Sequence, residues 1–229
     1  MNTTRFFKIP SYMVDIRRKL RLSSFMDLAQ QIAEEDSEAA GCGYNELIRD
    51  NNVWILSRMR MVITSMPSFK DSVSLETEHV GTDGPFYVRN YRMSDPEGRL
   101  LVKSDSMWAI MNLETRTVVR PDNQSAIPSD LPHRLRLPAD AVLEDSMVHT
   151  AAYSDIDYNS HVNNVKYMVW AFDALEKVAF ERDFVEVNIN FNHEVPPFSK
   201  VTVERFRCSD EYYVTGRIGD NHAFIASFK

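Results

Sequence analysis

The segment of residues 155–164 reads DIDYNSHVNN, in which acidic and amide side chains alternate with other residues and lead to a single histidine. If the backbone is extended here, the side chains of Asp157, Asn159 and His161 project to the same side. A neutral imidazole next to a carboxylate or an amide is the usual equipment of general acid–base catalysis. A helix is expected to begin directly afterwards, and its unpaired amide groups could polarise a carbonyl at the same place. These three residues therefore form a candidate catalytic cluster.

Two other interpretations of this segment are a calcium-binding loop and a structural turn. An EF-hand loop needs oxygen ligands at its first, third and fifth positions, glycine at the sixth and glutamate at the twelfth. The first three of these positions are filled, by Asp155, Asp157 and Asn159. Ser160 stands at the sixth position, however, and Lys166 at the twelfth, where a positive charge repels the ion. We therefore expect no metal ion and no cofactor, whereas a polar turn in which Asn163 or Asn164 caps the helix stays open.

The elements that must position this cluster are predicted twice in the same order. The first half has a strand-like segment at 12–22, a helix that Ser24 could cap and Gly41 could end, and then a series of strand-like runs. In the second half a short strand leads into a helix at 162–180, and a similar series of strand-like runs follows. Because the second helix is apolar nearly all round, it should be buried.

One long helix wrapped by a strongly curved antiparallel sheet would bury such a helix, and this arrangement is the hotdog fold. We therefore expect an α+β protein with a tandem hotdog fold. Its expected parts are an N-terminal unit at 1–120, a proline-rich linker at 121–146 and a C-terminal unit at 147–229.

The composition limits the partners that the protein is expected to have. A net charge of −7 argues against general nucleic-acid binding, which requires a basic face. No apolar run approaches the roughly 18 residues of a membrane span, and the N-terminal segment lacks the apolar core of a signal peptide. Cys42 and Cys208 have neither metal-ligand nor CxxC spacing, so we expect reduced thiols. The sequence thus predicts a cytoplasmic protein that binds neither nucleic acid nor membrane.

The longer stretch DIDYNSHVNNVKYMVWAFDAL resembles the D-x-N-x-H-V-N-N-x-x-Y-x-x-W signature of the acyl-acyl carrier protein (acyl-ACP) thioesterases of plants and bacteria. Segments of the first half, NNVWILSRMRMVITSMPSFKDSV and SDSMWAIMNLETRTVVRP, are similar to the N-terminal domain of the same family. The resemblance implies a tandem hotdog enzyme that hydrolyses the thioester of fatty acyl-ACP and releases free fatty acid, which terminates fatty acid synthesis. It also implies that the acylated carrier protein is the partner.

The resemblance places Asp157, Asn159 and His161 in the active site and adds Glu194, which matches a family glutamate on a strand. Val195 stands where many family members have a cysteine, so this chain cannot use a Cys–His–Asn mechanism from that position. We therefore expect Glu194 or Asp157 to activate a water molecule or to attack the thioester directly. His161 and Asn159 would then bind and polarise the thioester, although the sequence does not divide these roles.

An alignment of the two halves by their Asp-Ile pairs sets Arg17, Lys19 and Arg21 against the three candidate catalytic residues of the loop, and Met66 against Glu194. The first half is therefore expected to lack a catalytic site and to shape the acyl pocket. Because acyl carrier proteins are acidic along their recognition helix, the three basic residues are candidates for carrier binding. A second basic stretch at 133–136 is a weaker candidate.

Other functions would fit the same scaffold. An acyl-CoA thioesterase would differ only in the thiol carrier, and a non-catalytic regulator would only bind the acyl group. A hotdog dehydratase would need an H-x-x-x-x-G-x-x-P loop, which the sequence does not contain. Acyl chain length, saturation preference and a homodimeric state stay open.

Overall fold

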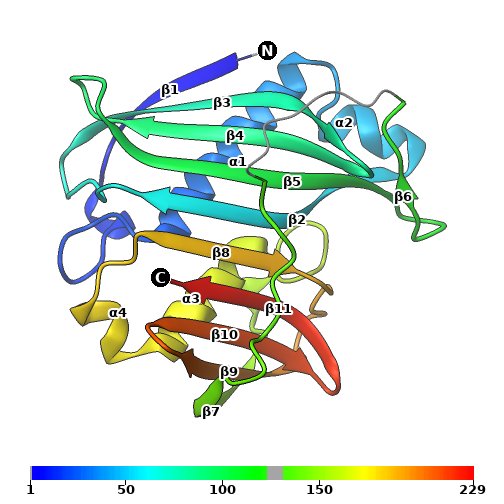
Figure 1. Ribbon diagram of the computed structural model, residues 1–229. Helices are drawn as coiled ribbons and strands as arrows, with labels where there is room; N and C mark the ends of the chain where they lie inside the picture. The colour runs from blue at the N-terminus through cyan, green and yellow to red at the C-terminus, as the bar shows by residue number, and fades with distance from the viewer. Residues whose placement is uncertain (1, 123–130) are drawn as a thin grey trace. The chain divides into compact units, whose positions relative to one another are not determined.

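The computed structural model describes residues 2–122 and 131–229, and the chain divides into two compact units, Met1–Pro132 and His133–Lys229 (Figure 1). Each unit is described separately below. Each consists of one long helix and an antiparallel sheet.

The first unit contains an antiparallel sheet with the strand order β1-β3-β4-β5-β2, and β6 pairs with β5. Its strands are β1 (Asn2–Lys8), β2 (Asn52–Ile63), β3 (Ser72–Asp83), β4 (Phe86–Ser94), β5 (Leu100–Asn112) and β6 (Val118–Val119). Its helices are α1 (Leu22–Ala39) and α2 (Tyr44–Leu47), with 3-10 turns at Ser11–Met13 and Ile48–Asp50. In Figure 1, α1 runs behind this sheet.

The helix α1 is held by an apolar face, as its spacing predicts. The buried positions on this face are Phe25, Leu28, Ala29 and Ile32. The helix begins at Leu22, so Ser24 lies inside it and is not its cap. At the other end Gly41 has φ +74, and the amide groups of Gly41 and Cys42 bond back to the carbonyls of Glu38 and Ser37. This Schellman-type ending confirms that Gly41 terminates the helix.

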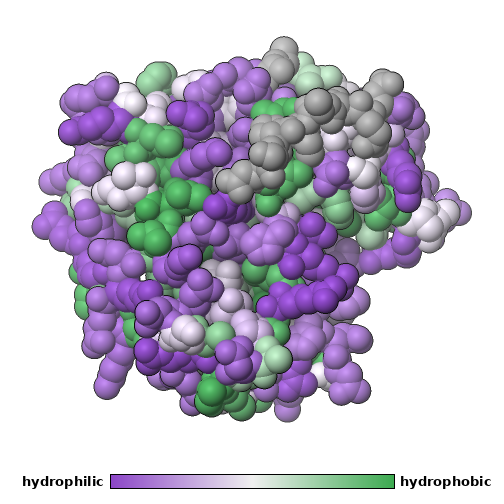
Figure 2. Space-filling view, in the orientation of Figure 1, coloured by the Kyte–Doolittle hydropathy of each residue, from purple (hydrophilic) through white to green (hydrophobic). Residues whose placement is uncertain are grey.

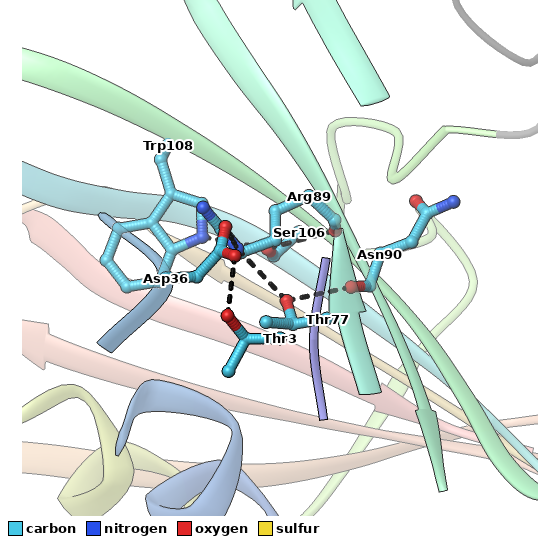
Figure 3. Close-up of polar contacts among 7 residues, drawn as sticks. All are labelled: Thr3, Asp36, Thr77, Arg89, Asn90, Ser106 and Trp108. Atoms are coloured by element: carbon cyan, nitrogen blue, oxygen red, sulfur yellow. Dashed lines mark hydrogen bonds and ion pairs between the residues drawn. The ribbon is translucent and has the colours of Figure 1, made fainter. Parts of the chain in front are cut away.

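A buried ion pair joins α1 to the sheet of the first unit (Figure 3). Nη1 of Arg89 on β4 lies 2.8 Å from Oδ2 of Asp36, whose side chain is 2 % exposed. The other Asp36 oxygen accepts a hydrogen bond from Oγ1 of Thr3 on β1 at 2.8 Å. Arg89 also donates to Oγ1 of Thr77 on β3 at 3.2 Å. Because a buried charge is costly without partners, these contacts fix the end of α1 against three strands.

The second unit has an antiparallel sheet with the strand order β8-β11-β10-β9-β7. Its strands are β7 (Val142–Thr150), β8 (Glu186–Phe191), β9 (Lys200–Cys208), β10 (Glu211–Ile218) and β11 (Asn221–Phe228). Its helices are α3 (Asn164–Leu175) and α4 (Lys177–Glu181), with a 3-10 turn at Tyr153–Asp155. Strands β7, β9, β10 and β11 all contact α3, which is the expected arrangement of a sheet around a helix.

The predicted continuous helix at 162–180 is wrong, because the structure divides it into α3 and α4. Glu176 separates the two with φ +50 and ψ −122, which lies outside the right-handed helical region. The predicted strand at 12–22 is also wrong. Arg18 has φ +63, so the chain turns there, and the first strand is formed instead by Asn2–Lys8.

Strand β7 is an edge strand that begins at Val142, within the segment 121–146 that was predicted as a linker. Most of its side chains are exposed, so it lacks the alternating pattern by which a half-buried strand is recognised. Apolar side chains appear over β7 at the bottom of Figure 2. The exposed apolar residues of this strand are Val142, Leu143, Met147 and Val148. Within 2–122 and 131–229, no helix is long and apolar enough to cross a membrane.

Candidate active site

The loop that carries the candidate residues connects the 3-10 turn after β7 to α3. Ile156 and Val162 form an isolated bridge, and the amide of Asp157 donates to the carbonyl of His161 at 2.9 Å. The amide of Ser160 in turn donates to the carbonyl of Asp157 at 3.1 Å, and Ser160 has φ +64. The segment is therefore a tight turn. The expectation that its side chains project to one side from an extended backbone is wrong.

Glu194 lies on a second loop, between β8 and β9. The expected position on a strand is wrong, since β8 ends at Phe191. The two prolines that follow Val195 cannot donate hydrogen bonds to a sheet, so pairing stops before them. The loop is anchored to β11 by the amides of residues 192 and 193, which both donate to the carbonyl of Ala223 at 2.8 and 3.1 Å.

The two loops meet at the residues next to the candidate groups. The amide of Val162 donates to the carbonyl of Val195 at 3.0 Å. This bond brings the neighbouring side chains together, and Nε2 of His161 lies 3.4 Å from Oε2 of Glu194. Their side chains are 33 % and 36 % exposed, so both can reach a ligand. A separation of 3.4 Å is long for a hydrogen bond, which is common in catalytic pairs without substrate.

Asp157 and Asn159 lie in the same turn as His161. Oδ1 of Asp157 accepts the amide of Asn159 at 2.8 Å, and the Asn159 side chain is exposed. An open pocket of about 510 Å³ lies beside Asp157. Its lining residues are Tyr153, Ser154, Ile156, Asp157, Pro197 and Phe198. Asp157 thus borders this open depression with one carboxylate oxygen already used by the turn, whereas Asn159, His161 and Glu194 do not line it.

The cap of α3 is Asn163, whose Oδ1 accepts the amide of Val165 at 2.8 Å. This confirms the structural role that was left open for Asn163 or Asn164. The amide of Val165 is satisfied by this cap, so it is not free to polarise a carbonyl.

Asp155 is a buried carboxylate that organises the start of the loop. Its Oδ2 accepts the amide of Ala152 at 2.9 Å and lies 3.1 Å from Nε2 of His149. Its Oδ1 lies 3.7 Å from Nζ of Lys166 on α3. This cluster could not be predicted from the sequence, because the spacing of His149 gives no sign of a partner. Among residues 2–122 and 131–229, no group of three or more acidic, His or Cys side chains could hold a metal ion.

Tyr167 is a further residue at this site that the sequence analysis missed, although it belongs to the quoted signature. Its hydroxyl oxygen accepts the amide of Val195 at 3.2 Å. Burial raises the pKa of Tyr167 strongly, and the negative charges of Glu194 and Asp157 raise it further. The hydroxyl therefore stays protonated near the two carboxylates.

Neither cysteine provides a nucleophile in the second unit's two loops. Burial raises the pKa of the Cys42 thiol, which lies in the first unit after α1. Desolvation and a hydrogen bond to Asp140 raise the pKa of Cys208 at the end of β9. A raised pKa lowers the thiolate fraction and hence the reactivity of both residues.

The first unit contains a turn with the same backbone bonds. The amide of Asp15 donates to the carbonyl of Lys19 at 2.8 Å, and the amide of Arg18 donates to the carbonyl of Asp15 at 3.0 Å. Val14 and Leu20 form the bridge that corresponds to the one between Ile156 and Val162 in the second unit. Arg18 and Ser160 have nearly the same positive φ.

These bonds correct the expected alignment of the two halves by two residues. Asp15 corresponds to Asp157, and Lys19 corresponds to His161. The expected alignment is wrong because it sets the Asp-Ile pair at 15–16 against the pair at 155–156. In the structure the turn at 15–19 corresponds to the turn at 157–161. The first unit therefore keeps one of the candidate residue types, and the expectation that it lacks all of them is wrong. The pairing of Met66 with Glu194 is correct, because the amide of Leu20 donates to the carbonyl of Pro67 as Val162 does to Val195.

The three basic residues of the first turn make separate contacts. Nε of Arg17 lies 3.5 Å from Oδ2 of Asp15, and Nζ of Lys19 donates to Oγ of Ser68 at 3.2 Å. The Arg21 guanidinium donates to the carbonyl of Tyr12.

Two more cations extend this basic surface around an aromatic ring. Arg18 and Lys70 lie 5.5 and 5.3 Å from the centre of the Phe69 ring. Contact with the ring face partly stabilises both charges.

Family models match both units of the chain. The acyl-ACP thioesterase N-terminal domain matches residues 1–126, and the acyl-ACP thioesterase C-terminal domain matches residues 143–224. The chain belongs to the acyl-ACP thioesterase family. The chloroplastic palmitoyl-acyl carrier protein thioesterase of Arabidopsis thaliana is 29% identical over 204 residues, which cover 77% of this chain and 48% of that protein. The corresponding protein of Gossypium hirsutum is 27% identical over 194 residues, covering 73% and 46%.

Two solved members of the acyl-ACP thioesterase group share the fold. An acyl-ACP thioesterase from Bacteroides thetaiotaomicron matches with a TM-score of 0.88 at 22% identity, covering 99% of this chain and 96% of that one. The 12:0-ACP thioesterase from Umbellularia californica matches with a TM-score of 0.88 at 20% identity, covering 100% and 96%. These matches confirm the tandem hotdog fold. The chain spans about half the length of the curated plant relatives it matches.

Proposed function

We propose that this chain is an acyl-ACP thioesterase that hydrolyses the thioester of fatty acyl-ACP and releases free fatty acid. The observation that carries the proposal is the contact between His161 and Glu194 across two loops of the second unit. An imidazole paired with a carboxylate, both half-exposed, is suited to activate water. Membership of the acyl-ACP thioesterase family supplies the class of substrate.

In the proposed reaction, Glu194 accepts a proton from water while the water oxygen bonds to the carbonyl carbon of the thioester. His161 binds and polarises that carbonyl, so the negative charge that develops on its oxygen is stabilised. The tetrahedral intermediate then loses the carbon–sulfur bond. The sulfur leaves with the proton as the thiol of the carrier, and the water oxygen stays in the fatty acid.

Asp157 is the second candidate base. One of its oxygens accepts the Asn159 amide, so its carboxylate is partly committed to the turn. This partial commitment favours Glu194 as the base. In this proposal Asp157 and Asn159 shape the site, and Asp157 adds its negative charge. Direct attack by either carboxylate would pass through a mixed anhydride, and incorporation of ¹⁸O from water into the enzyme carboxylate would reveal that route.

The carrier-binding surface is proposed to include Arg17, Lys19 and Arg21 in the first unit. The support is the local concentration of positive charge, which Arg18 and Lys70 extend. An acidic carrier would be attracted to such a surface. The acyl-pocket role of the first unit, a homodimeric state and a cytoplasmic location stay predictions.

The direct test is thiol release from matched panels of acyl-ACP and acyl-CoA, measured in parallel for the unchanged protein and for Glu194→Gln. Release from acyl-ACP that depends on Glu194 supports the proposal. Release from acyl-CoA alone would make the chain an acyl-CoA thioesterase. Acyl binding without release from either panel would indicate a non-catalytic binding protein.

A further inference from the structure

The backbone of Val195 is held on both sides of its Cα atom by elements of the second unit. Its carbonyl accepts the amide of Val162, and its amide donates to the Tyr167 hydroxyl. Val195 itself is 0% exposed. Val162 directly follows His161, and Val195 directly follows Glu194. The position of the Glu194 backbone is therefore tied to α3 through one hydroxyl group.

The Tyr167 ring is fixed by aromatic neighbours from several elements. Its centre lies 5.4 Å from the ring centres of Trp170 and Phe224, and 5.7 Å from that of Phe191. All three contacts have the edge-to-face geometry that aromatic pairs favour. Gly216 on β10 makes room for this cluster, because a Cβ atom there would lie 2.1 Å from Cε1 of Phe224. The hydroxyl is thus presented by a side chain with little freedom to move.

The first unit provides an internal comparison. Leu20 corresponds to Val162, and the residues five positions later are Phe25 and Tyr167. Pro67 corresponds to Val195 and keeps the carbonyl contact, since it accepts the Leu20 amide at 2.8 Å. Phe25 has no hydroxyl and Pro67 has no amide hydrogen, so both halves of the second contact are missing together.

The comparison separates the roles of the two backbone contacts of Val195. The carbonyl contact occurs in both units and therefore serves the common fold. The amide contact occurs only in the unit that has Glu194, where the first unit has Met66. A contact that served only the fold would be expected in both units. This contact is instead present in the unit that has Glu194 and absent from the unit that has Met66 at the same position.

We propose that Tyr167 is a positioning residue, which fixes the Val195 peptide and so holds the Glu194 carboxylate beside His161. The inference rests on the proposed thioesterase function and adds a residue to it. In this proposal the Tyr167 hydroxyl acts through the hydrogen bond that it accepts from the Val195 amide, and Glu194 and His161 carry the reaction.

The test is Tyr167→Phe, which removes one oxygen and keeps the ring. Loss of precise placement should lower kcat about tenfold while KM for acyl-ACP changes less than about twofold. The matched control is Tyr91→Phe, which removes a hydroxyl from another Tyr that is only 1% exposed, in the first unit. This control should lower stability comparably and leave kcat unchanged.

A double-mutant cycle separates positioning from simple destabilisation. In the Glu194→Gln background, Tyr167→Phe should cause little further loss of kcat, because the group that it positions is already gone. Equal losses in both backgrounds, or a lower Tm with unchanged kcat, would overturn the proposal. Val195→Pro removes the amide and copies Pro67, so it should reproduce the kinetic effect of Tyr167→Phe without adding to it.

A measurement independent of turnover keeps this inference apart from the proposed function. Amide hydrogen exchange at Val195, followed by NMR, should be about tenfold faster in Tyr167→Phe and unchanged in Tyr91→Phe. If the protein releases no thiol but this exchange responds, the thioesterase proposal fails and the contact stands. Unchanged exchange at Val195 would refute the positioning role whatever the activity.

Discussion

Nε2 of His161 lies 3.4 Å from Oε2 of Glu194, although the two residues belong to different loops of the second unit. The contact depends on the backbone bond between Val162 and Val195, which joins the loops one residue away from each side chain. The candidate active site is therefore built by backbone pairing, and the side chains meet as a consequence. Variants of the side chains should remove the chemistry without unfolding the loops.

The first prediction concerns these side chains. Glu194→Gln, His161→Gln and Asp157→Asn should each lower kcat by at least about 100-fold, the usual scale for a lost acid–base or polarising group. Steady-state thiol release from acyl-ACP measures the effect. His193→Gln is the control, because His193 is exposed and adjacent in sequence to Glu194. An equal loss in the control, or activity retained in Glu194→Gln, would contradict the assignment.

The second prediction concerns the thiols. The double change Cys42→Ser with Cys208→Ser should keep kcat within about threefold of the parent, because both thiols have raised pKa values and neither belongs to the two loops. Treatment of the parent with iodoacetamide should likewise preserve turnover. Inactivation by labelling of either cysteine would show that the carboxylate mechanism is wrong.

The third prediction concerns the carrier. Replacing Arg17, Lys19 and Arg21 together by Glu should raise KM for acyl-ACP about tenfold or more and weaken its salt dependence, because attraction between opposite charges is screened by salt. Hydrolysis of a short acyl thioester without carrier protein should be spared. Arg134→Glu with Arg136→Glu tests the second basic stretch in the same way. If both substrates suffer equally, the three residues support the fold and do not bind the carrier.

The fourth prediction concerns the buried ion pair of the first unit. Asp36→Ala should lower the free energy of unfolding by about 3–5 kcal/mol, because it leaves the Arg89 charge buried without its partner. Urea denaturation measures the change. The control is Arg99→Ala, which breaks surface pairs with Asp95 and Glu97; the Arg99 side chain is 76% exposed, so this change should lower the free energy of unfolding far less. Similar losses of unfolding free energy in the two variants would mean that other groups stabilise the buried Arg89 charge.

The fifth prediction concerns pH and the pair between Glu204 and Arg217. Two hydrogen bonds of 2.8 and 2.9 Å from the Arg217 guanidinium lower the pKa of Glu204 in the folded protein. The unfolded chain therefore binds this proton more readily, and the stabilisation is present above about pH 4.5 and lost as pH falls further.

The measurement for this pair is the free energy of unfolding as a function of pH. Its decrease below about pH 4.5 should be smaller in Glu204→Gln than in the parent. If the free energy of unfolding falls with pH equally steeply in Glu204→Gln and in the parent, the pair between Glu204 and Arg217 does not contribute to this pH dependence.

The tandem arrangement could be predicted from the sequence because it depends on local patterns, whereas the catalytic roles of Asp157, Asn159, His161 and Glu194 stay predictions. The apolar face of α1 and the glycine at its end are such patterns, and so is the quoted signature. The contact between Tyr167 and Val195 could not be predicted, because it depends on how two loops pack. The register of the first turn was misjudged for a similar reason, since positive φ at Arg18 and Ser160 leaves no clear mark in the residue types.

The contact between Lys166 and Asp155 supplies the loop of residues 155–166 with a counter-ion of its own. The twelfth position of that loop supplies an ammonium group to the carboxylate at its first position, at 3.7 Å. The counter-ion is thus covalently attached to the chain, and its effective concentration is set by α3 and not by the surrounding solution. A loop that resembles a calcium sensor in part of its sequence should therefore keep its order whatever the level of free divalent ions.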